Sequence, residues 1–286
     1  MPKKAKRTES DFGHGGIPLK KDLRDRKFSE LGMAPIPFNW AKGFDALKKT
    51  YPVKDQGPSS SCGGQTASYL MQNLYQKKEL SAKNIYSNIF YAGGGTTLRD
   101  ILKWATTSGI SEEALVVSYN QGKPPTEAFM TVRDSNTPAT RANALKHKGL
   151  SYAFVNPDIE SYAQAIRDNG GAILQIWGQD NGTWLSAFPL PARRRVWNHF
   201  VVADGAFLIE GVKFIRIRNS WGKDCGNNGH QYIAEAHFNA GMVQTGGIIY
   251  NPAVIDDTEA KKKSDMILII QKLISLYQQL LKQNPV

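Results

Sequence analysis

The chain has 286 residues and a formal net charge of +11, with 41% hydrophobic and 21% charged residues. This length can bury one or two domain cores, and the composition is that of a globular chain, which excludes a largely disordered one. No apolar run is long enough to cross a bilayer, so we expect no transmembrane segment. The positive charge is spread along the sequence without a nucleic-acid-binding motif, so we expect no nucleic acid partner.

The first residues, Met1–Arg7, are basic, but polar residues follow them instead of the apolar stretch of a secretory signal. Only two cysteines occur, Cys62 and Cys225, which are too few for a disulfide framework. The sequence does not determine the location of the protein, although these two features favour the cytoplasm. Because neither Cys-x-x-Cys nor His-Glu-x-x-His is present, we expect no metal site and no cofactor.

Residues 1–34 are expected to form an N-terminal arm that leads into the folded domain. Their first fifteen or so residues contain little apolar material, which indicates a mobile arm with order beginning near Ile17. Extended segments with several prolines continue from there to Gly57. We therefore expect this part of the chain to lie over a body formed by later residues.

The segment after Cys62 has the apolar spacing of a buried helix face, with Ala67, Leu70, Met71 and Leu74 at i, i+3, i+4 and i+7. This pattern predicts a helix that begins at Cys62. Two more helices are predicted over 82–91 and 97–107. Residues 58–150 should therefore form a mainly helical lobe.

Residues 151–257 should form a strand-rich lobe, which the extended N-terminal segment joins. A helix over 159–168 is expected to end at Asn169-Gly170-Gly171, since glycine commonly terminates helices. Strands are predicted over 172–177, 199–203, 207–210, 212–218 and 231–236. The overall prediction is an α+β domain over residues 35–257.

The C-terminal part, residues 258–286, is predicted to be a linker followed by an amphipathic helix over 266–282. Its apolar face includes Met266, Ile269 and Leu273, with Leu276 and Leu280 further along. This face is too wide for a helix surrounded by water. We expect the helix to pack on the domain, to self-associate or to bind a partner.

Three short motifs occur in a fixed order: Gln56-Gly57 before Cys62, then Asn198-His199, then Asn219-Ser220-Trp221-Gly222. With Pro52–Gly57 and Asn219–Gly229 as they stand, the chain resembles the papain-like cysteine proteases. His199 follows Cys62 by 137 positions, within the separation of about 130–150 residues typical of that family. The short lead-in over 16–25 is similar to that of prokaryotic and viral members.

The resemblance implies a two-lobe papain-like fold, with a helical lobe, a barrel-like strand-rich lobe and the active site in the cleft between them. Cys62 would be the nucleophile, and His199 would take its proton and pass it to the leaving amine. Asn219 would orient the imidazole, and Gln56 with the Cys62 backbone N–H would bind the oxyanion. The N-terminus of the helix and a nearby imidazolium would lower the pKa of Cys62.

The resemblance also implies residues that contact a peptide substrate. Trp221 would shield the His199–Asn219 hydrogen bond from water, and Asn198 would stand beside the base. Gly94 and Gly95 would pair with the substrate backbone, because glycine permits close approach.

The chain departs from the family pattern at four positions around this constellation, one of which is Asn198, where the family commonly has aspartate. Ser59 replaces a common cysteine, Gly63 replaces a tryptophan, and Cys225 stands where a second tryptophan is usual.

The predicted function is a cysteine endopeptidase that acts through an acyl-enzyme. Two alternatives stay open: a papain-fold binding or scaffold module with weak catalysis, and a transpeptidase or ligase with the same thioester chemistry. Arg193–Arg195 form either a solvated loop or a feature that favours acidic substrates.

Overall fold

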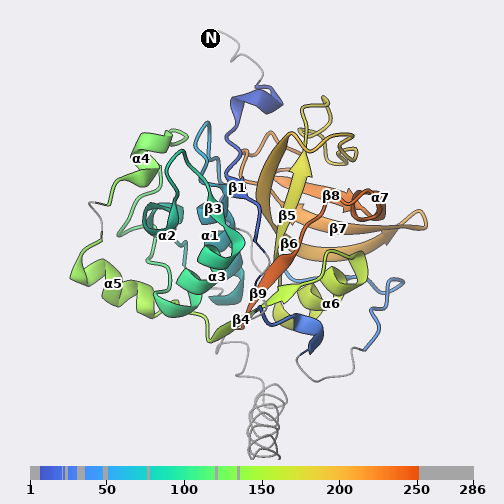
Figure 1. Cartoon of the computed structure of the whole chain (residues 1–286), viewed down its shortest axis with the longest axis horizontal. Helices are drawn as coiled ribbons and strands as arrows, with labels where there is room; N and C mark the ends of the chain where they lie inside the picture. Colours follow the sequence, from blue (N-terminus) through green and yellow to red (C-terminus); the bar gives the residue numbers. More distant parts are fainter. Residues whose placement is uncertain are drawn as a thin grey trace, which may run out of the picture.

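The computed structural model describes residues 7–20, 22, 25–30, 36–47, 51–75, 78–119, 122–133 and 136–250. The chain forms two lobes, a helical one and a strand-rich one, that lie side by side (Figure 1). The C-terminal helix expected over 266–282 is outside the described residues. Among those residues, no helix has the length and apolarity that a membrane span needs.

The helical lobe is built around a helix that begins at Cys62, as the apolar spacing predicted. The helices predicted over 82–91 and 97–107 are also confirmed, each within two residues at either end. Two short helices that the sequence did not predict follow, and each begins with a threonine side chain that caps the first turn, Thr126 and Thr137. The helices are α1 (Cys62–Tyr75), α2 (Ala82–Ile89), α3 (Leu98–Thr107), α4 (Glu127–Thr131) and α5 (Pro138–Leu145).

The strand-rich lobe contains a seven-stranded sheet with the order β4-β9-β5-β6-β7-β8, and the short β2 also pairs with β6. The sheet is open, so the barrel expected from the resemblance is only loosely formed. Two helices belong to this lobe, α6 (Ile159–Asn169) and α7 (Glu235–Asn239). The strands are β2 (Phe44–Asp45), β4 (Ser151–Val155), β5 (Ala172–Gly178), β6 (Trp197–Ile209), β7 (Val212–Arg218), β8 (His230–Ala234) and β9 (Gly246–Tyr250).

Three strand predictions were wrong in detail. The segments 199–203 and 207–210 form one strand, β6, because a bulge between Ala203 and Gly205 keeps both halves paired with β7. The strand predicted over 231–236 ends at Ala234, where α7 begins. Strands β4 and β9 were not predicted, and β9 opens with two glycines, which are uncommon inside strands.

The two faces of the sheet contribute to two separate cores. Ile173, Phe200 and Val202 pack with Leu70 and other side chains of α1 and α3. The next residues along the same strands point to the opposite face, as alternation in a strand requires, and pack with α6. The β5–β6 ladder therefore holds α1, and with it Cys62, directly against the strand-rich lobe.

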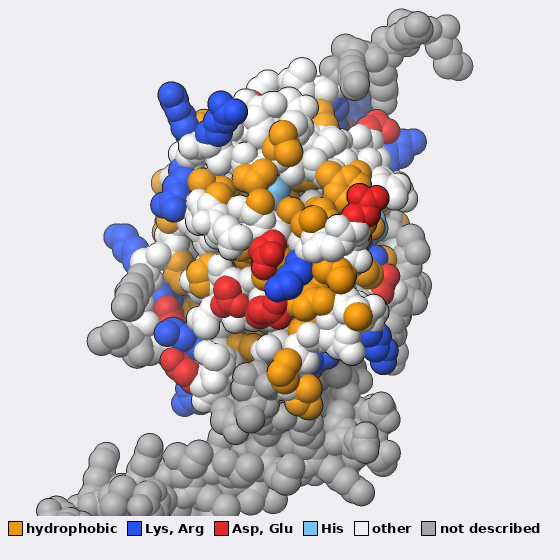
Figure 2. Space-filling model, turned by 90° about the vertical axis from the view of Figure 1, so that its right-hand side faces the viewer, with side chains coloured by type: hydrophobic (Ala, Val, Ile, Leu, Met, Phe, Trp, Pro, Cys, Tyr) orange, Lys and Arg blue, Asp and Glu red, His pale blue; other side chains and the backbone are white. Residues whose placement is uncertain are grey.

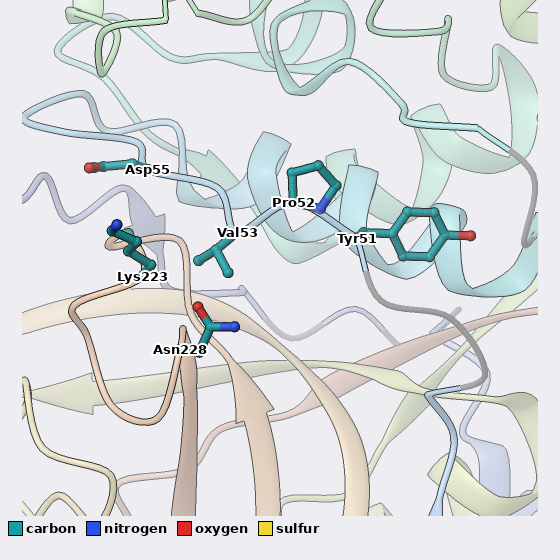
Figure 3. A pocket seen from close by; sticks show the side chains of 7 residues that line it. Tyr51, Pro52, Val53, Asp55, Lys223 and Asn228 are labelled. Atoms are coloured by element: carbon teal, nitrogen blue, oxygen red, sulfur yellow. The ribbon is translucent and has the colours of Figure 1, made fainter.

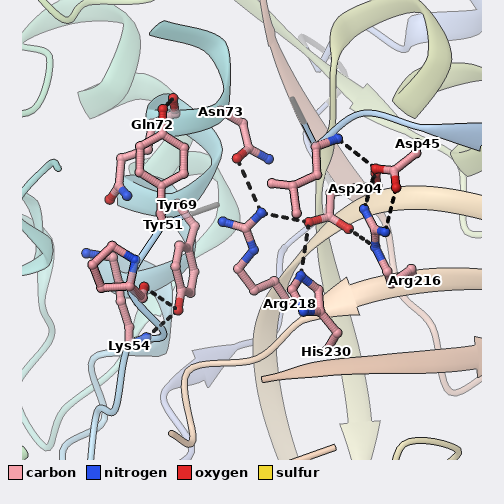
Figure 4. A network of polar contacts seen from close by, with 12 residues as sticks. Asp45, Tyr51, Lys54, Tyr69, Gln72, Asn73, Asp204, Arg216, Arg218 and His230 are labelled. Atoms are coloured by element: carbon pink, nitrogen blue, oxygen red, sulfur yellow. Dashed lines mark hydrogen bonds and ion pairs between the residues drawn. The ribbon is translucent and has the colours of Figure 1, made fainter. Parts of the chain in front are cut away.

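A buried ionic network connects β6 and β7 to α1 (Figure 4). Asp204 is fully buried and accepts hydrogen bonds from Arg216 Nε at 2.7 Å and from Arg218 Nη2 at 3.0 Å. Arg216 also binds Asp45, and Arg218 lies over the ring of Tyr69, 4.8 Å from its centroid. This network connects the two lobes beside the strand that leads into Asn219.

Replacing Asp204 with alanine is expected to lower the free energy of unfolding by about 3–5 kcal/mol, because it leaves the buried Arg218 cation without its carboxylate. Asp168→Ala is the matched control, since Asp168 forms an exposed ion pair with Arg167, and such pairs contribute about 1 kcal/mol or less. Denaturant unfolding measures both variants. Equal losses would contradict a special role for the buried network.

The N-terminal segment corrects one expectation: residues 7–20 are ordered against the body instead of forming a mobile arm. A 3-10 turn covers Glu9–Asp11, and β1 (Gly16–Ile17) pairs in parallel with β3 (Thr96–Thr97) of the helical lobe. A second 3-10 turn covers Phe28–Glu30. The segment lies between the lobes because its glycines let the backbone approach both closely.

The outer face of the strand-rich lobe mixes charged and hydrophobic side chains (Figure 2). On this face, Lys and Arg lie mostly toward the rim and Asp and Glu nearer the centre. In the same lobe, Arg193–Arg195 are exposed, and the backbone N–H groups of Arg193 and Arg194 bind the side chain of Gln179.

Candidate active site

Cys62 is the first residue of α1 and is fully buried. Its thiol lies within reach of backbone N–H groups that favour the thiolate, including those of Phe200 on β6 and Gly15 of the N-terminal segment. Burial outweighs these groups and raises the pKa of the thiol to about 11. The lowered pKa expected from the sequence is therefore not found in this closed arrangement, because water is excluded from the sulfur.

His199 lies on β6 and is also fully buried. Its Nε2 is 2.9 Å from Asn219 Oδ1, and the ring of Trp221 covers it with centroids 4.9 Å apart. The other ring nitrogen, Nδ1, has no hydrogen-bond partner among the described residues. Burial lowers the pKa of His199 to about 3, the nearby His14 acts in the same direction, and the Asn219 hydrogen bond opposes both. The closed site therefore holds a neutral thiol and a neutral imidazole.

Gln56 is fully buried, and it lies beside the residues that precede α1. Nε2 donates to the carbonyl oxygens of Gly13 at 2.9 Å and of Ser59 at 2.8 Å. Oε1 accepts from the Ser220 hydroxyl at 2.6 Å, which connects Gln56 to the residue after Asn219. The amide donor is thus already bound to a peptide carbonyl that comes from outside α1.

Asn219 directly follows β7, and both atoms of its amide group are hydrogen-bonded. Oδ1 faces His199 and also accepts from the Ser220 backbone N–H at 2.8 Å. Nδ2 donates to Gln231 Oε1 at 2.9 Å and lies 3.7 Å from the sulfur of Cys225. Cys225 and Cys62 are both free buried thiols.

Residues 12–17, Phe12-Gly13-His14-Gly15-Gly16-Ile17, fill the space between the lobes, and we call them the strap. The Gly15 carbonyl accepts from Thr96 N at 2.9 Å, and a Cβ on Gly95 would come within 2.6 Å of that carbonyl. On the other wall, a Cβ on Gly16 would lie 2.1 Å from Asn198 Oδ1. The strap therefore touches both Gly95 and Asn198, whereas Gly94 faces Ser60 and Glu127.

Side chains at the N-terminal end anchor the strap. Phe12 stacks on Trp221, with centroids 5.0 Å apart, and His14 stacks on Trp197 at 4.5 Å. Just before the strap, the buried Glu9 carboxylate accepts three backbone hydrogen bonds, at 2.7 to 3.3 Å, from Asn181, Gly182 and Trp184. Three charge-assisted bonds to one carboxylate make this the main polar anchor of the segment.

An open hollow lies between the segment 51–55 and the loop that carries Lys223 and Asn228 (Figure 3). Its lining includes Tyr51, Val53, Asp55, Lys223 and Asn228, and none of the four proposed catalytic residues lines it. Within the described residues, no group of three or more His, Cys, Asp or Glu side chains could hold a metal ion.

The structure joins His199 to Asn219 and Gln56 to Ser220 by hydrogen bonds. The strap approaches Cys62 through Gly15 and His199 through His14. The sequence missed three features of the site. Neither His14, nor the strap glycines, nor Gln231 was singled out. The contacts of these residues lie far away in the sequence. Only the run Phe12-Gly13-His14-Gly15-Gly16, an aromatic residue followed by glycines, could have signalled a close backbone contact.

Comparison with solved structures gives extensive similarity at low sequence identity. The chain is similar to xylellain, a cysteine protease from Xylella fastidiosa, with 20% identity, a TM-score of 0.68 and coverage of 86% of this chain and 98% of that one. It is also similar to procathepsin B S9 from Trypanosoma congolense, with 14% identity, a TM-score of 0.63 and coverage of 84% and 87%. Procathepsin L2 of Tenebrio molitor has 17% identity, a TM-score of 0.63 and coverage of 84% and 79%.

No protein-family model matches the sequence, and no curated protein sequence matches it. The likeness therefore rests on the arrangement of the elements: a helix that begins at Cys62 packed against an open sheet that carries His199 and Asn219. By this arrangement, the chain has the fold of the papain-like cysteine proteases.

Proposed function

We propose that this protein is a cysteine endopeptidase that hydrolyses peptide bonds through the Cys62 thiolate. The observation that carries the proposal is the hydrogen bond from Gln56 Nε2 to the Gly13 carbonyl, at 2.9 Å. In this bond a side-chain amide holds a peptide carbonyl of the strap, and the next two strap residues approach His199 and Cys62. An oxyanion donor must likewise hold the oxygen of a peptide carbonyl.

In the proposed reaction, His199 Nδ1 takes the proton of Cys62, and the sulfur attacks the carbonyl carbon of the scissile bond. Gln56 Nε2 and the Cys62 backbone N–H bind the negatively charged oxygen. The C–N bond then breaks, His199 gives its proton to the leaving amine, and a thioester remains. Water activated by His199 hydrolyses the thioester, which restores the thiol and releases the acid.

The strap would act in this scheme as an inhibitor and not as a substrate, because it runs in the wrong direction. The leaving amine must lie beside His199, so the C-terminal part of a substrate belongs on the Trp221 side. In the strap, the N-terminal residue Phe12 lies against Trp221, and the C-terminal residues pair with β3. The active form therefore requires displacement of the strap.

Alkylation of Cys62 tests the proposal, with Cys225 as an internal control because it is a second buried thiol. Iodoacetamide at mildly acid pH should label Cys62 in a chain with an open cleft, since only an activated thiolate reacts there. A peptide-library digest should then show cleavage that Cys62→Ala abolishes. Labelling without cleavage would favour the binding or scaffold module, and transfer to an added amine would favour the ligase.

Strap release is expected to increase as the pH falls from about 6.5 toward 4. Burial lowers the pKa of His14 to about 4, although the negative charge of Asp180 opposes this effect. A released His14 would titrate near 6.5, so the open state binds the proton more readily, and the closed state is most stable above that pH. His199, which faces His14 at 6.2 Å, contributes in the same direction.

Hydrogen–deuterium exchange of the strap, corrected for intrinsic rates, measures this effect. Between pH 7.5 and pH 5, the open fraction should rise roughly tenfold or more. His14→Phe keeps a ring on Trp197 but cannot titrate, so its pH dependence should be weaker than that of the natural chain. The same slope in both chains would show that His14 does not contribute.

A further inference from the structure

Gln231 is the second residue of β8 and is fully buried, 12 positions after Asn219. Its Nε2 donates to two backbone carbonyls, Trp184 O at 2.6 Å and Ser186 O at 3.0 Å. Its Oε1 accepts from Asn219 Nδ2 at 2.9 Å. The Gln231 side chain thus joins the loop before β6 to the residue that contacts His199.

The orientation of both amide groups follows from their partners. A carbonyl oxygen can only accept, so the side of Gln231 that faces Trp184 and Ser186 must be its NH2 group. Its oxygen therefore faces Asn219, and that oxygen requires an N–H from Asn219. The Ser220 backbone N–H favours the same orientation of Asn219, because this donor requires the Asn219 oxygen as its acceptor.

The orientation of Asn219 determines which nitrogen of His199 carries the proton. With the oxygen of Asn219 turned toward His199, Nε2 must carry the proton of the neutral ring. Nδ1 then has a lone pair, and it is the atom left without a partner among the described residues. This tautomer is the one that can accept a proton from a thiol.

We propose that Gln231 is a positioning residue that sets the tautomer of His199 through Asn219. The inference rests on the proposed function, since the tautomer matters for proton transfer from Cys62. Nothing in the motif order pointed to Gln231, which lies on a different strand from both His199 and Asn219. Without its acceptor, the buried Asn219 NH2 group would keep only the thiol of Cys225 at 3.7 Å.

Nitrogen-15 NMR of histidine-labelled protein tests the tautomer without any need for activity. In the natural chain at neutral pH, His199 should show a protonated Nε2 and an unprotonated Nδ1. In Gln231→Leu, we expect a mixture of the two tautomers or exchange broadening. A pure Nε2-protonated signal in Gln231→Leu would overturn the proposal even if the chain proves not to be a peptidase.

Gln231→Glu is the conservative variant. Burial raises the pKa of a carboxyl group, so the protonated acid can accept from Asn219 with one oxygen and donate to a carbonyl with the other. It should therefore retain more of the natural tautomer than Gln231→Leu. Thermal melting identifies a variant that fails to fold, and Gln231→Met then takes the place of Gln231→Leu, with the same result expected.

If the protein cleaves peptides, the kinetics of cleavage provide a second test. Gln231→Leu should lower kcat at least tenfold and change KM less than twofold. The alkaline limb of its pH profile should move to lower pH, because the Asn219 bond favours the imidazolium. Among the described residues, His14 of the strap is the titratable group that acts on His199, and the variant retains it. An unchanged kcat, or a uniform loss of activity with no shift of the alkaline limb, would overturn the proposal.

If the natural chain does not cleave peptides at all, the proposed function fails, and NMR alone decides the role of Gln231.

Discussion

The Glu9→Ala variant is expected to cleave added peptides about 10- to 100-fold faster than the natural chain. Glu9 accepts backbone hydrogen bonds from residues 181, 182 and 184, and we expect their loss to cost about 1.5–3 kcal/mol in total, because water binds the freed N–H groups. These bonds form only while the segment before the strap is docked. Losing them shifts the equilibrium toward the open cleft, and the rate rises in proportion to the open fraction.

The measurement is the initial rate of peptide cleavage at one pH, with mass spectrometry used to verify that the chain stays intact. Asp11→Ala is the matched control, because Asp11 is an exposed carboxylate on the same turn whose hydrogen bonds go to Thr8. Its rate should stay within about twofold of the natural chain.

Gly15→Val should displace the strap through a different contact, one made by the strap itself. A Cβ at Gly15 would lie 1.7 Å from the Ser60 carbonyl oxygen, so the strap could not stay in place. This variant should also cleave faster. If neither Glu9→Ala nor Gly15→Val changes the rate, and Cys62 stays unreactive in both, the strap does not control access to the thiol.

Gln56→Leu is expected to lower kcat about 10²–10³-fold when it is introduced into the Glu9→Ala chain. The structure shows Gln56 Nε2 bound to the carbonyl of Gly13, and in the open cleft the substrate oxygen would replace that carbonyl. Leucine has a similar volume but no donor. The interaction strengthens as charge develops on the oxygen, so the loss should appear in kcat more than in KM.

Gln72→Leu is the control for damage to the fold. Gln72 is a buried amide on α1, and its Oε1 accepts from the Leu80 backbone N–H, away from the strap. Both variants are compared by peptide kinetics and by denaturant unfolding. If Gln72→Leu loses as much activity as Gln56→Leu, or if the Gln56→Leu loss lies entirely in KM, Gln56 does not stabilise the transition state.

The helical part of the fold was the most predictable, because its signals are local. The apolar spacing after Cys62 and the Gly170 that ends α6 each act within a few residues, so the start of α1 and both ends of α6 were predicted to within one residue. Strands were less predictable, since pairing depends on distant partners. The bulge after Ala203 that makes β6 one strand is visible only beside β7.

By itself, the sequence determined the order of Gln56, Cys62, His199 and Asn219, and with it the expected fold, because a motif and a helical period are carried by neighbouring residues. Only the tertiary structure decided that the strap fills the cleft, that burial leaves the thiol and imidazole neutral, and that Gln231 holds Asn219. These features depend on contacts between residues far apart in the chain and on the exclusion of water, neither of which has a local pattern.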